Sequence, residues 1–417
     1  MTRRRKIKIQ YKYKNKLYED IRDIVYNNKL DIDFEYIFEE YLPFQVFITG
    51  RTFFKDVTIN ISTPYYPFSD GSELPDFSKS IKEYLNSREF DGKDFIAAVS
   101  GGVDSSLMAL ETKADTIYSG YYNDPEYSEI PFSKEVAKVL NSKHYTYELT
   151  EDDFLNNLEE FMEVVCSPIA GYGGVMEYIT LKKSLEDNKN TKFVLFGNGG
   201  DEIFFGYPFN YFIKDIYEYG NIKPKYMSNF APQKRYIIDK ALNILLVSSL
   251  NRSTQKEMYN SYSTFNLISN LSNIGDMKSK ILHVNINIIL PSLLHVNNQM
   301  CKACNVTGLN PLTNKEFIKY ADKLNDPISD IPKEYLRNIR NDLPKPIVNN
   351  YIKRGFPMPL NDWDNAKGYV GEIYNSFFKR MDDMEKIPYT GLNRYAWGIL
   401  QTELVLRKFF DNKSRSN

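Results

Sequence analysis

Residues 95–106 combine the residue types that proteins use to hold phosphate. The stretch reads Phe-Ile-Ala-Ala-Val-Ser-Gly-Gly-Val-Asp-Ser-Ser, so an apolar run ends abruptly in serines, glycines and an aspartate. The apolar run predicts a buried strand, and the residues after the turn are compatible with a helix. Glycines let backbone N–H groups turn inward, and the N-terminus of a helix adds positive potential. This stretch therefore predicts a phosphate-binding turn.

Each polar residue of the turn has its own expected role. Gly101 and Gly102 shape the backbone, and the hydroxyl groups of Ser100 and Ser105 can donate hydrogen bonds to phosphate oxygens. Asp104 would not touch phosphate directly, so an acid at this position suits a bound cation. The turn differs from the common phosphate loop, in which a lysine and then a serine or threonine follow the glycines. The alternative interpretation is an ordinary strand–turn–helix corner, because Gly, Asp and Ser are common turn residues.

A second glycine turn lies at residues 197–202, with the sequence Gly-Asn-Gly-Gly-Asp-Glu. It fails as a dinucleotide fingerprint, because Glu202 occupies the third glycine position. It fits a second turn on the phosphate side, with an ordinary glycine turn as the alternative. Asp201 and Asp104 would then follow neighbouring strands of one sheet, where two carboxylates can share one Mg²⁺ ion that is bound to ATP.

A third segment, near the far end of the chain, carries a lysine among turn residues. Residues 353–359 read Lys-Arg-Gly-Phe-Pro-Met-Pro. A lone lysine is usually solvated, but the glycine and prolines beside Lys353 could hold it rigidly over an ATP site. Its charge would there neutralise pyrophosphate as it departs. Spacing alone does not decide between these two interpretations.

The elements that must position these turns alternate between strands and helices from residue 94 onward. This alternation predicts an α/β fold with a parallel sheet and helices on both of its faces. Ligands bind such sheets beyond the carboxyl ends of the strands, and both glycine turns lie at such ends. Strands are expected at 95–99, 116–121, 144–149 and 192–196, and helices at 105–112, 131–140 and 178–185.

Two further regions flank this core. Residues 212–410 predict a mostly helical part, with apolar residues at helical spacing in 286–294 and 395–410. Residues 1–88 predict a small separate unit that contains β-strands, expected at 41–44, 46–50 and 57–61, and ends in a helix at 77–85. We therefore expect two domains, 1–88 and 89–410, and divide the second into an ATP-binding α/β core (89–211) and a mainly helical part (212–410).

Composition excludes several classes of protein. The chain has 417 residues, 42% hydrophobic and 15% aromatic, which supports a large core and excludes a disordered chain. The net charge of −1 gives no electrostatic case for nucleic acid. The basic start at residues 3–8 is interpreted as a solvated terminus, with RNA contact as the alternative. No apolar run suits a membrane span or a signal peptide, so we expect neither.

The cysteines give a further indication of the compartment. There are only three, Cys166, Cys301 and Cys304, which suits a reducing cytoplasm rather than a disulfide framework. Cys301 and Cys304 form a lone C-x-x-C, but the chain has no second pair and only three histidines. Buried free thiols on a helix are therefore a better interpretation than a zinc site.

Three segments, in this order, resemble the synthetase domain of the asparagine synthetase family. They are the pyrophosphate-binding signature at 100–105, the Gly-x-Gly-x-Asp-Glu turn at 197–202 with Gly206-Tyr207 after it, and Lys-x-Gly-Phe-x-x-Pro at 353–359. The resemblance spans about residues 90–410. Weaker matches lie at Ser128-Glu129, His144, Trp397 and the Lys-x-x-Leu-Arg segment 333–337.

The resemblance implies an adenine-nucleotide α-hydrolase-like fold and an ATP-dependent ligase. Such an enzyme activates a carboxylate, with aspartate among the candidates, as an acyl-adenylate, releases pyrophosphate and forms an amide with ammonia or an amine. A dry pocket would protect the intermediate from water. The resemblance assigns ATP and pyrophosphate binding to Ser100, Gly101, Gly102, Asp104, Ser105, Gly197 and Gly199, Mg²⁺ binding to Asp104 and Asp201, and catalysis to Lys353, Asp201 and Asn198.

Departures from the family pattern concern the substrates. Glutamine-using members carry a cysteine after the initiator methionine, whereas this chain has Thr2, and residues 34–61 resemble only the last part of that glutaminase domain. A truncated N-terminal unit is therefore expected, with ammonia or an amine as donor and a separate glutaminase as one source. Asn198 stands where the family has glutamate, and an amide cannot act as a base.

These departures leave the substrate open. We expect a small-molecule or peptide carboxylate as the group that is activated. One alternative is a peptide or β-lactam-type amide cyclase on the same scaffold. Others are a non-catalytic nucleotide-binding relative and a thiolating or RNA-modifying pyrophosphatase, which the neutral charge and the cysteine pattern disfavour.

Overall fold

The computed structural model describes most of the chain. The sequence interpretations at Thr2, at the basic start and at Lys353 lie outside the described residues. The described residues are 9–42, 45–61, 75–167, 171–207, 210, 276–323, 331–351, 358–360, 362–381, 389, 391 and 394–411.

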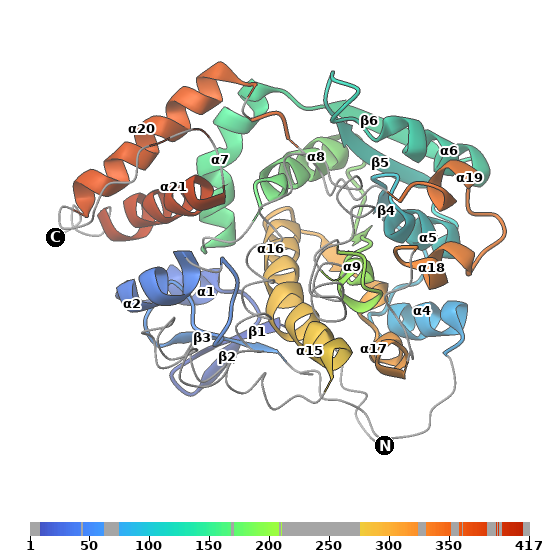
Figure 1. Cartoon of the computed structure of the whole chain (residues 1–417), viewed down its shortest axis with the longest axis horizontal. Coiled ribbons are helices and arrows are strands. Elements are labelled where there is room, and N and C mark those ends of the chain that lie inside the picture. The colour runs from blue at the N-terminus through green and yellow to red at the C-terminus, as the bar shows by residue number, and fades with distance from the viewer. Residues whose placement is uncertain are drawn as a thin grey trace.

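The main sheet has five strands in the order β6-β5-β4-β7-β8. Helix α16 (Leu290–Ala303) lies beside it (Figure 1). Every neighbouring pair of strands is parallel. The strand that precedes the first glycine turn is central, and the strand that precedes the second turn pairs directly with it. The predicted α/β fold and its first four strands are confirmed. The strands are β4 (Phe95–Ala98), β5 (Thr116–Tyr121), β6 (Lys143–Glu148), β7 (Phe193–Leu195) and β8 (Thr307–Leu309).

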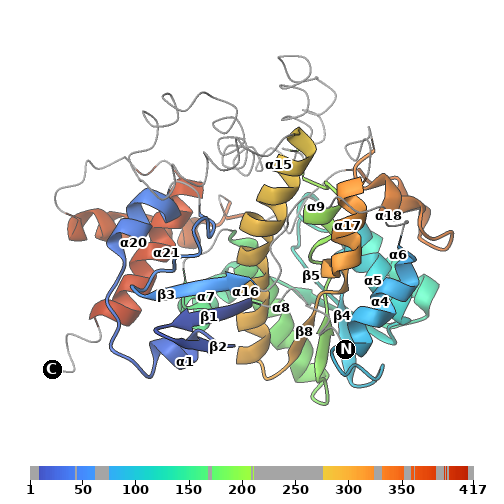
Figure 2. The ribbon, with the colours of Figure 1, turned by 90° about the horizontal axis from the view of Figure 1, so that it is seen from below.

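Helices cover both faces of this sheet (Figure 2). Helices α4 (Phe77–Asn86), α5 (Val103–Thr112) and α6 (Ile130–Leu140) lie on one face. Helices α8 (Gly173–Asp187) and α16 (Leu290–Ala303) lie on the other. The structure confirms the helices that the sequence predicts at 77–85, 105–112, 131–140 and 178–185. The last of these, α8, begins earlier than expected. Its first turn holds Gly173 and Gly174, which carry no helical signal but allow a close approach. A Cβ at Gly174 would lie 3.2 Å from Phe161 Cζ.

Strand β8 is the one strand of the main sheet that the sequence does not predict. It has three residues and contains a glycine, so no alternation of polar and apolar residues is recognisable. A Cβ at Gly308 would lie 2.8 Å from Asn297 Oδ1 and 3.0 Å from Cys301 Sγ. The glycine therefore allows α16 to pack closely on this edge of the sheet, at the expense of a recognisable pattern.

A small antiparallel sheet, with the order β2-β1-β3, precedes the main sheet. Its strands are β1 (Ile9–Tyr13), β2 (Lys16–Tyr18) and β3 (Val57–Ile61), so the strand expected at 57–61 is confirmed. The strands expected at 41–44 and 46–50 are wrong for the described residues. Tyr41 ends a π-helical segment, η1 (Ile37–Tyr41), and residues 46–50 form bends.

A buried glutamate explains why residues 46–50 do not form a strand. The Glu40 carboxylate accepts hydrogen bonds from the Ile48 N–H at 2.9 Å and the Thr49 N–H at 3.0 Å. It also accepts one from the Thr49 hydroxyl at 2.6 Å. These N–H groups are satisfied by a side chain and need no neighbouring strand.

The N-terminal region contacts the rest of the chain through buried tyrosines of β1 and η1. The Tyr11 hydroxyl donates to His295 Nδ1 on α16 at 2.6 Å. The Tyr41 hydroxyl donates to Gln401 Oε1 at 2.7 Å, on helix α21 (Arg394–Leu406). These contacts join it to the helical part of the molecule, and the domain boundary near residue 88 stays a prediction.

The C-terminal part is mostly helical in the described residues, as predicted. Helices α7 (Glu151–Val165), α20 (Asp364–Arg380) and α21 lie together, and Arg380 Nε donates to Glu403 Oε2 at 2.8 Å. No helix in the described ranges is long and apolar enough to cross a membrane. The remaining helices are α1 (Arg22–Val25), α2 (Phe34–Tyr36), α9 (Gly200–Ile203), α15 (Met277–Val284), η3 (Asn285–Ile289), η4 (Pro311–Thr313), α17 (Lys315–Lys323), α18 (Glu334–Asn338), α19 (Lys345–Val348) and η5 (Arg407–Asp411).

Candidate functional site

The first glycine turn connects β4 to α5 and is held by its own serines. Gly101 has a φ of +87°, and a Cβ there would lie 2.5 Å from Phe132 Cβ, so the turn requires glycine. The Ser100 N–H donates to Ser105 Oγ at 3.2 Å, and the Gly102 N–H donates to Ser100 Oγ at 3.3 Å. Ser100 is exposed, so the turn opens to solvent at the N-terminus of α5, where backbone N–H groups favour an anion.

The second glycine turn packs directly on the first. A Cβ at Gly197 would lie 2.6 Å from the Ser105 backbone nitrogen, and one at Gly200 would overlap the Asp104 carboxylate. Gly199 has a φ of +99°, and a Cβ there would lie 2.9 Å from Thr313 Cγ2. The glycines of the second turn therefore bring the two turns into contact, as the sequence predicts for neighbouring strand ends.

The two predicted cation ligands meet at a single lysine. Lys333 Nζ contacts the Asp104 carboxylate and lies 2.6 Å from Asp201 Oδ1. The side chains of all three residues are at most 12% exposed. Gly206 makes room for this arrangement, because a Cβ there would overlap both Lys333 Cε and Asp201 Oδ1. The structure thus places Asp104 and Asp201 around one cationic position.

The donor set at this position suits a divalent cation that arrives with ATP. Two carboxylates that reach the same ammonium nitrogen can both reach one metal ion, and oxygen ligands are those that Mg²⁺ prefers. The part of the chain that the structure describes holds no group of three acidic, histidine or cysteine side chains that could enclose a metal. The two acids would therefore leave coordination positions for phosphate oxygens and water, as is usual for Mg²⁺ bound to a nucleotide.

The remaining acid of the second turn has a structural role. The Glu202 carboxylate accepts a hydrogen bond from the Gly199 N–H at 3.0 Å and one from the Tyr207 hydroxyl. Burial raises the pKa of the Tyr207 hydroxyl, and the negative charge of Glu202 adds to the effect. The Asn285 amide donates to the Glu202 carbonyl oxygen at 3.0 Å. These contacts hold the turn in shape from its inner side, so Glu202 positions Asp201.

Lys333 and Arg337 are site residues whose role in this arrangement the sequence does not reveal. Lys333 precedes α18, and Arg337 lies one turn later on that helix. Arg337 donates to the carbonyl oxygens of Pro332 at 2.7 Å, Ile347 at 2.7 Å and Val348 at 2.9 Å. It therefore holds the two ends of segment 332–348 together. The one available signal is the match of both residues to the Lys-x-x-Leu-Arg pattern.

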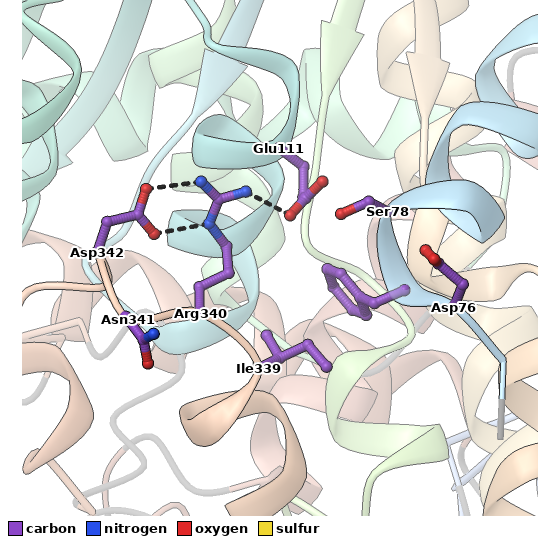
Figure 3. A pocket seen from close by; sticks show the side chains of 8 residues that line it. Asp76, Ser78, Glu111, Ile339, Arg340, Asn341 and Asp342 are labelled. Atoms are coloured by element: carbon purple, nitrogen blue, oxygen red, sulfur yellow. Dashed lines mark hydrogen bonds and ion pairs between the residues drawn. The ribbon is translucent and has the colours of Figure 1, made fainter.

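A second ion pair fixes the same segment to α5. Arg340 contacts the Glu111 carboxylate at 2.5 Å and also pairs with Asp342 at 2.6 Å (Figure 3). Asp104 and Glu111 lie at opposite ends of α5, so Lys333 and Arg340 anchor the segment at both ends of this helix. A surface hollow of about 490 Å³, which Asp76 and Ile339 also line, lies beside Arg340. It is at the far end of α5 from the glycine turns.

The structure says less about the other two predicted catalytic residues, Asn198 and Lys353. Asn198 lies between the glycines of the second turn and is partly exposed, and within the described residues its amide makes no hydrogen bond. Lys353 lies outside the described residues, five positions beyond Val348, whose carbonyl Arg337 binds. The described contacts therefore unite Ser100, Ser105, Asp104 and Asp201, and leave the role of Lys353 a prediction.

The cysteines and His144 lie in structural positions. Burial raises the pKa of the Cys301 thiol, and that of Cys304 to about 11, so both thiols are protonated at neutral pH. Cys301 lies on α16 and is 1% exposed. The His144 ring contacts the Ser119 hydroxyl at 2.9 Å, and that hydroxyl donates to the Val99 carbonyl at 2.5 Å. His144 thus supports the end of β4 through the Ser119 hydroxyl, without contacting the turn itself.

Comparison with known proteins gives a match that covers most of the chain. The family model described as asparagine synthase matches residues 81–409. That range includes both glycine turns, Lys333 and the segment that contains Lys353.

Individual relatives match over shorter stretches. A protein of Methanocaldococcus jannaschii, provisionally named glutamine-hydrolyzing asparagine synthetase 2, is 31% identical over 116 residues, which cover 27% of this chain and 22% of that protein. Glutamine-hydrolyzing asparagine synthetase 1 of Bacillus subtilis is 26% identical over 113 residues, which cover 26% of this chain and 17% of that protein. The aligned part thus spans about a fifth of the length of these relatives.

Proposed function

Because this chain belongs to the asparagine synthase family, we propose that it is an ATP-dependent, AMP-forming ligase that makes amides. It adenylates a carboxylate with release of pyrophosphate, and ammonia or an amine then attacks the acyl carbon. The observation that carries the proposal is the meeting of Asp104 and Asp201 at one cationic position, next to a serine- and glycine-lined helix N-terminus.

ATP binding rests on the first turn. The Ser100 and Ser105 hydroxyls donate to phosphate oxygens, and the backbone of Gly101 and Gly102 leaves room for them beside the N-terminus of α5. Gly197 and Gly199 keep the second turn close enough for both acids to serve one nucleotide. The Ser100 and Ser105 hydroxyls contact each other, and Ser105 Oγ accepts from the Ser100 N–H, so these groups must exchange partners to bind phosphate.

Asp104 and Asp201 are the residues that would hold Mg²⁺. When bound there, the ion would neutralise phosphate charge and orient the phosphate chain for in-line attack. The Lys333 ammonium already contacts both carboxylates, so it must give up at least part of these contacts to a divalent ion. Lys333 keeps the acids close together before ATP arrives, which limits their electrostatic repulsion.

Lys353 is proposed to neutralise the charge that develops on departing pyrophosphate. Support comes from the contacts that lead to it along the chain. Arg337 binds the Ile347 and Val348 carbonyls, and Lys333 fixes the start of the same segment to the acid pair. The segment that these contacts hold ends at Val348, five residues before Lys353 in the sequence.

The chemistry of the proposed steps balances without a redox partner. A carboxylate oxygen attacks the α-phosphorus, the bond between the α- and β-phosphates breaks, and pyrophosphate leaves. The amine nitrogen then attacks the acyl carbon, loses a proton, and displaces AMP. Asn198 can hydrogen-bond to the acyl substrate but cannot accept the proton, so another group or water takes it.

The acyl substrate defines a second candidate function. An amide cyclase, in which the attacking amine belongs to the same molecule as the activated carboxylate, uses the same activation step. The observation that favours this candidate is Asn198, an amide at a position where the family pattern has glutamate. The change alters the acyl side of the site and leaves the phosphate side intact.

The test is the identity of the nucleotide product. The full chain is incubated with ATP, Mg²⁺, ammonium and a panel of mono- and dicarboxylic amino acids, and the products are separated by chromatography. We expect AMP and pyrophosphate with at least one acid, and loss of both in Asp201→Asn. Asp115→Asn, an exposed acid at the opposite edge of the sheet, is the matched control. Formation of ADP and phosphate, or equal activity in Asp201→Asn, would overturn the proposal.

A further inference from the structure

One row of residues crosses the main sheet just below the two glycine turns. The pairing places Ala98 of β4 beside Tyr118 of β5. On the other side, Phe196 follows the paired residue Leu195 and lies next in the row. Neighbours at one level of a parallel sheet share a face, so these side chains point the same way. That face is the one covered by α8 and α16, because Asn310, at the end of the row, donates to Asn297 of α16 at 3.0 Å.

The centre of this row is open. Tyr118 and Phe196 are each only 3% exposed, whereas Ala98 between them keeps part of its surface accessible. Ala98 is on the central strand of a sheet that helices cover on both faces, where full burial is expected. Ala98 is thus a small side chain between two large buried ones, and solvent still reaches it.

Glu177 of α8 points to the same side. Tyr178 and Lys182 on this helix bond to Glu160 of α7 at 2.7 and 2.6 Å, so these two positions face α7. One face of α8, with the buried residues Thr180 and Ser184, is directed toward the sheet, and the face with Gly174 lies against α16. Glu177 lies between these two faces of the helix. Burial raises the pKa of the Glu177 carboxyl to about 7. Its charge also contributes to the raised pKa values of Tyr118 on β5 and Cys301 on α16, so it lies near both.

Among the residues that the structure describes, the carboxyl group of Glu177 has no hydrogen-bond or ion-pair partner. Within the described ranges no side chain or backbone group donates a hydrogen bond to it, and no lysine or arginine pairs with it. It nevertheless keeps part of its surface accessible. The Glu177 carboxyl group is thus largely surrounded by protein, but solvent still reaches the residue. An uncompensated carboxylate there destabilises the fold, and a cation that binds it would remove that cost.

We propose that Glu177 lines a subsite over Ala98, beside the ATP site, that binds a cationic nitrogen group of the substrate. Its place in the reaction rests on the proposed function. The bound group is either the ammonium form of the attacking amine or an ammonium group on the acid that is activated. Both have the same chemistry at Glu177, a positive N–H donor that pairs with an isolated carboxylate.

The binding test uses a small cation as probe and needs no turnover. Propylammonium and its neutral analogue 1-propanol are compared at pH 8, where Glu177 is mostly ionised, by saturation-transfer NMR on the full chain. We expect a signal for propylammonium that exceeds that for 1-propanol and weakens about tenfold in affinity in Glu177→Gln. Glu186→Gln, an exposed acid on the same helix, is the matched control and should bind like the wild type.

Two results would overturn the subsite. One is equal signals for propylammonium and 1-propanol in the wild-type chain, which needs no variant to interpret. The other is unchanged propylammonium binding in Glu177→Gln. A thermal melt accompanies the variant, which should be at least as stable as the wild type because an unpaired buried charge has been removed.

A second arm identifies the source of the cationic group. Acid-dependent exchange of pyrophosphate into ATP is measured with aspartate and with succinate, which lacks the amino group. If the ammonium belongs to the acid, Glu177→Gln abolishes the preference for aspartate. If it belongs to the amine, exchange is unchanged and only the KM for the amine in amide formation rises. Normal exchange with neither effect would contradict the subsite alone, whereas a wild-type chain that shows no exchange with any acid of the panel would contradict the proposed ligase.

Discussion

Lys333 holds two acidic side chains together. Its ammonium contacts both Asp104 and Asp201, and all three side chains are largely removed from water. Opposite charges at this separation attract strongly where few water molecules screen them. The lysine therefore acts as an internal counter-ion, and any metal ion must compete with it for the same oxygens.

This competition gives a prediction for Lys333→Met. Without the ammonium, the acid pair keeps its full charge, so the protein should bind Mn²⁺ in the absence of nucleotide roughly tenfold more tightly. The measurement is the free Mn²⁺ signal in electron paramagnetic resonance. Lys192→Met removes an exposed lysine that pairs with Asp94 and should leave Mn²⁺ binding unchanged. Weaker Mn²⁺ binding in Lys333→Met would contradict the competition.

At the scale of elements, the two glycine turns form one unit because glycines let them touch. Gly200→Ala would push a methyl group into the Asp104 carboxylate. We expect destabilisation by about 1–3 kcal/mol, as for other overpacked positions, together with loss of ATP binding. Gly368→Ala lies on the exposed side of α20, where a Cβ meets nothing within 4 Å, and should stabilise by up to about 1 kcal/mol. Urea unfolding measures the stability of each variant, and titration with ATP measures its nucleotide binding. Equal effects of the two variants would contradict the close contact between the two glycine turns.

A second contact between elements is made by Arg337, which joins the two ends of segment 332–348. Arg337→Met removes hydrogen bonds to three backbone carbonyls. Each such bond to a charged donor contributes about 1.5–3 kcal/mol, so the segment should open far more readily. Hydrogen exchange should accelerate in 332–348 while α5 stays protected. Lys345→Met, an exposed change in the same segment, should leave exchange as it is. Unchanged exchange in Arg337→Met would show that other contacts hold the segment.

The elements also show which parts of the site can be predicted from sequence. The turns at Ser100–Ser105 and Gly197–Glu202 are local, since each is a strand end followed by glycines and a helix start, and the structure confirms both locations. Lys333 meets Asp104 only through the tertiary fold, and no local pattern reports that contact. Strand β8 and the bends at 46–50 depend on contacts that no local pattern reports, between Gly308 and α16 and between Glu40 and the Ile48 and Thr49 N–H groups.

At the scale of the whole molecule, the small N-terminal sheet is joined to the main core through His295. Its Nδ1 accepts from Tyr11 and its Nε2 donates to the Val165 carbonyl at 2.9 Å, which requires the neutral ring. Burial lowers the pKa of His295 to about 4. The folded state therefore resists protonation, whereas the unfolded chain takes up the proton near pH 6.5.

The sign of this shift predicts how stability depends on pH. A histidine whose pKa is lowered by folding contributes fully to the free energy of unfolding above about pH 6.5. This contribution is lost as the pH falls toward 4. Relative to His295→Gln, the wild-type free energy of unfolding should fall by about 2 kcal/mol between pH 6.5 and 5, measured by urea titration. The comparison isolates His295 from Glu177, whose raised pKa acts in the opposite direction. Parallel pH profiles for the two proteins would contradict the shift.

The proposed function depends on one chemical event, the transfer of AMP to a carboxylate. The most direct measurement uses the acid that supports pyrophosphate release, labelled with ¹⁸O in its carboxyl group, and mass spectrometry of the nucleotide product. The account predicts that AMP carries one ¹⁸O atom after amide formation, because the acyl C–O bond breaks when the amine attacks. AMP without label, or label in released phosphate, would show that the carboxylate is not adenylated.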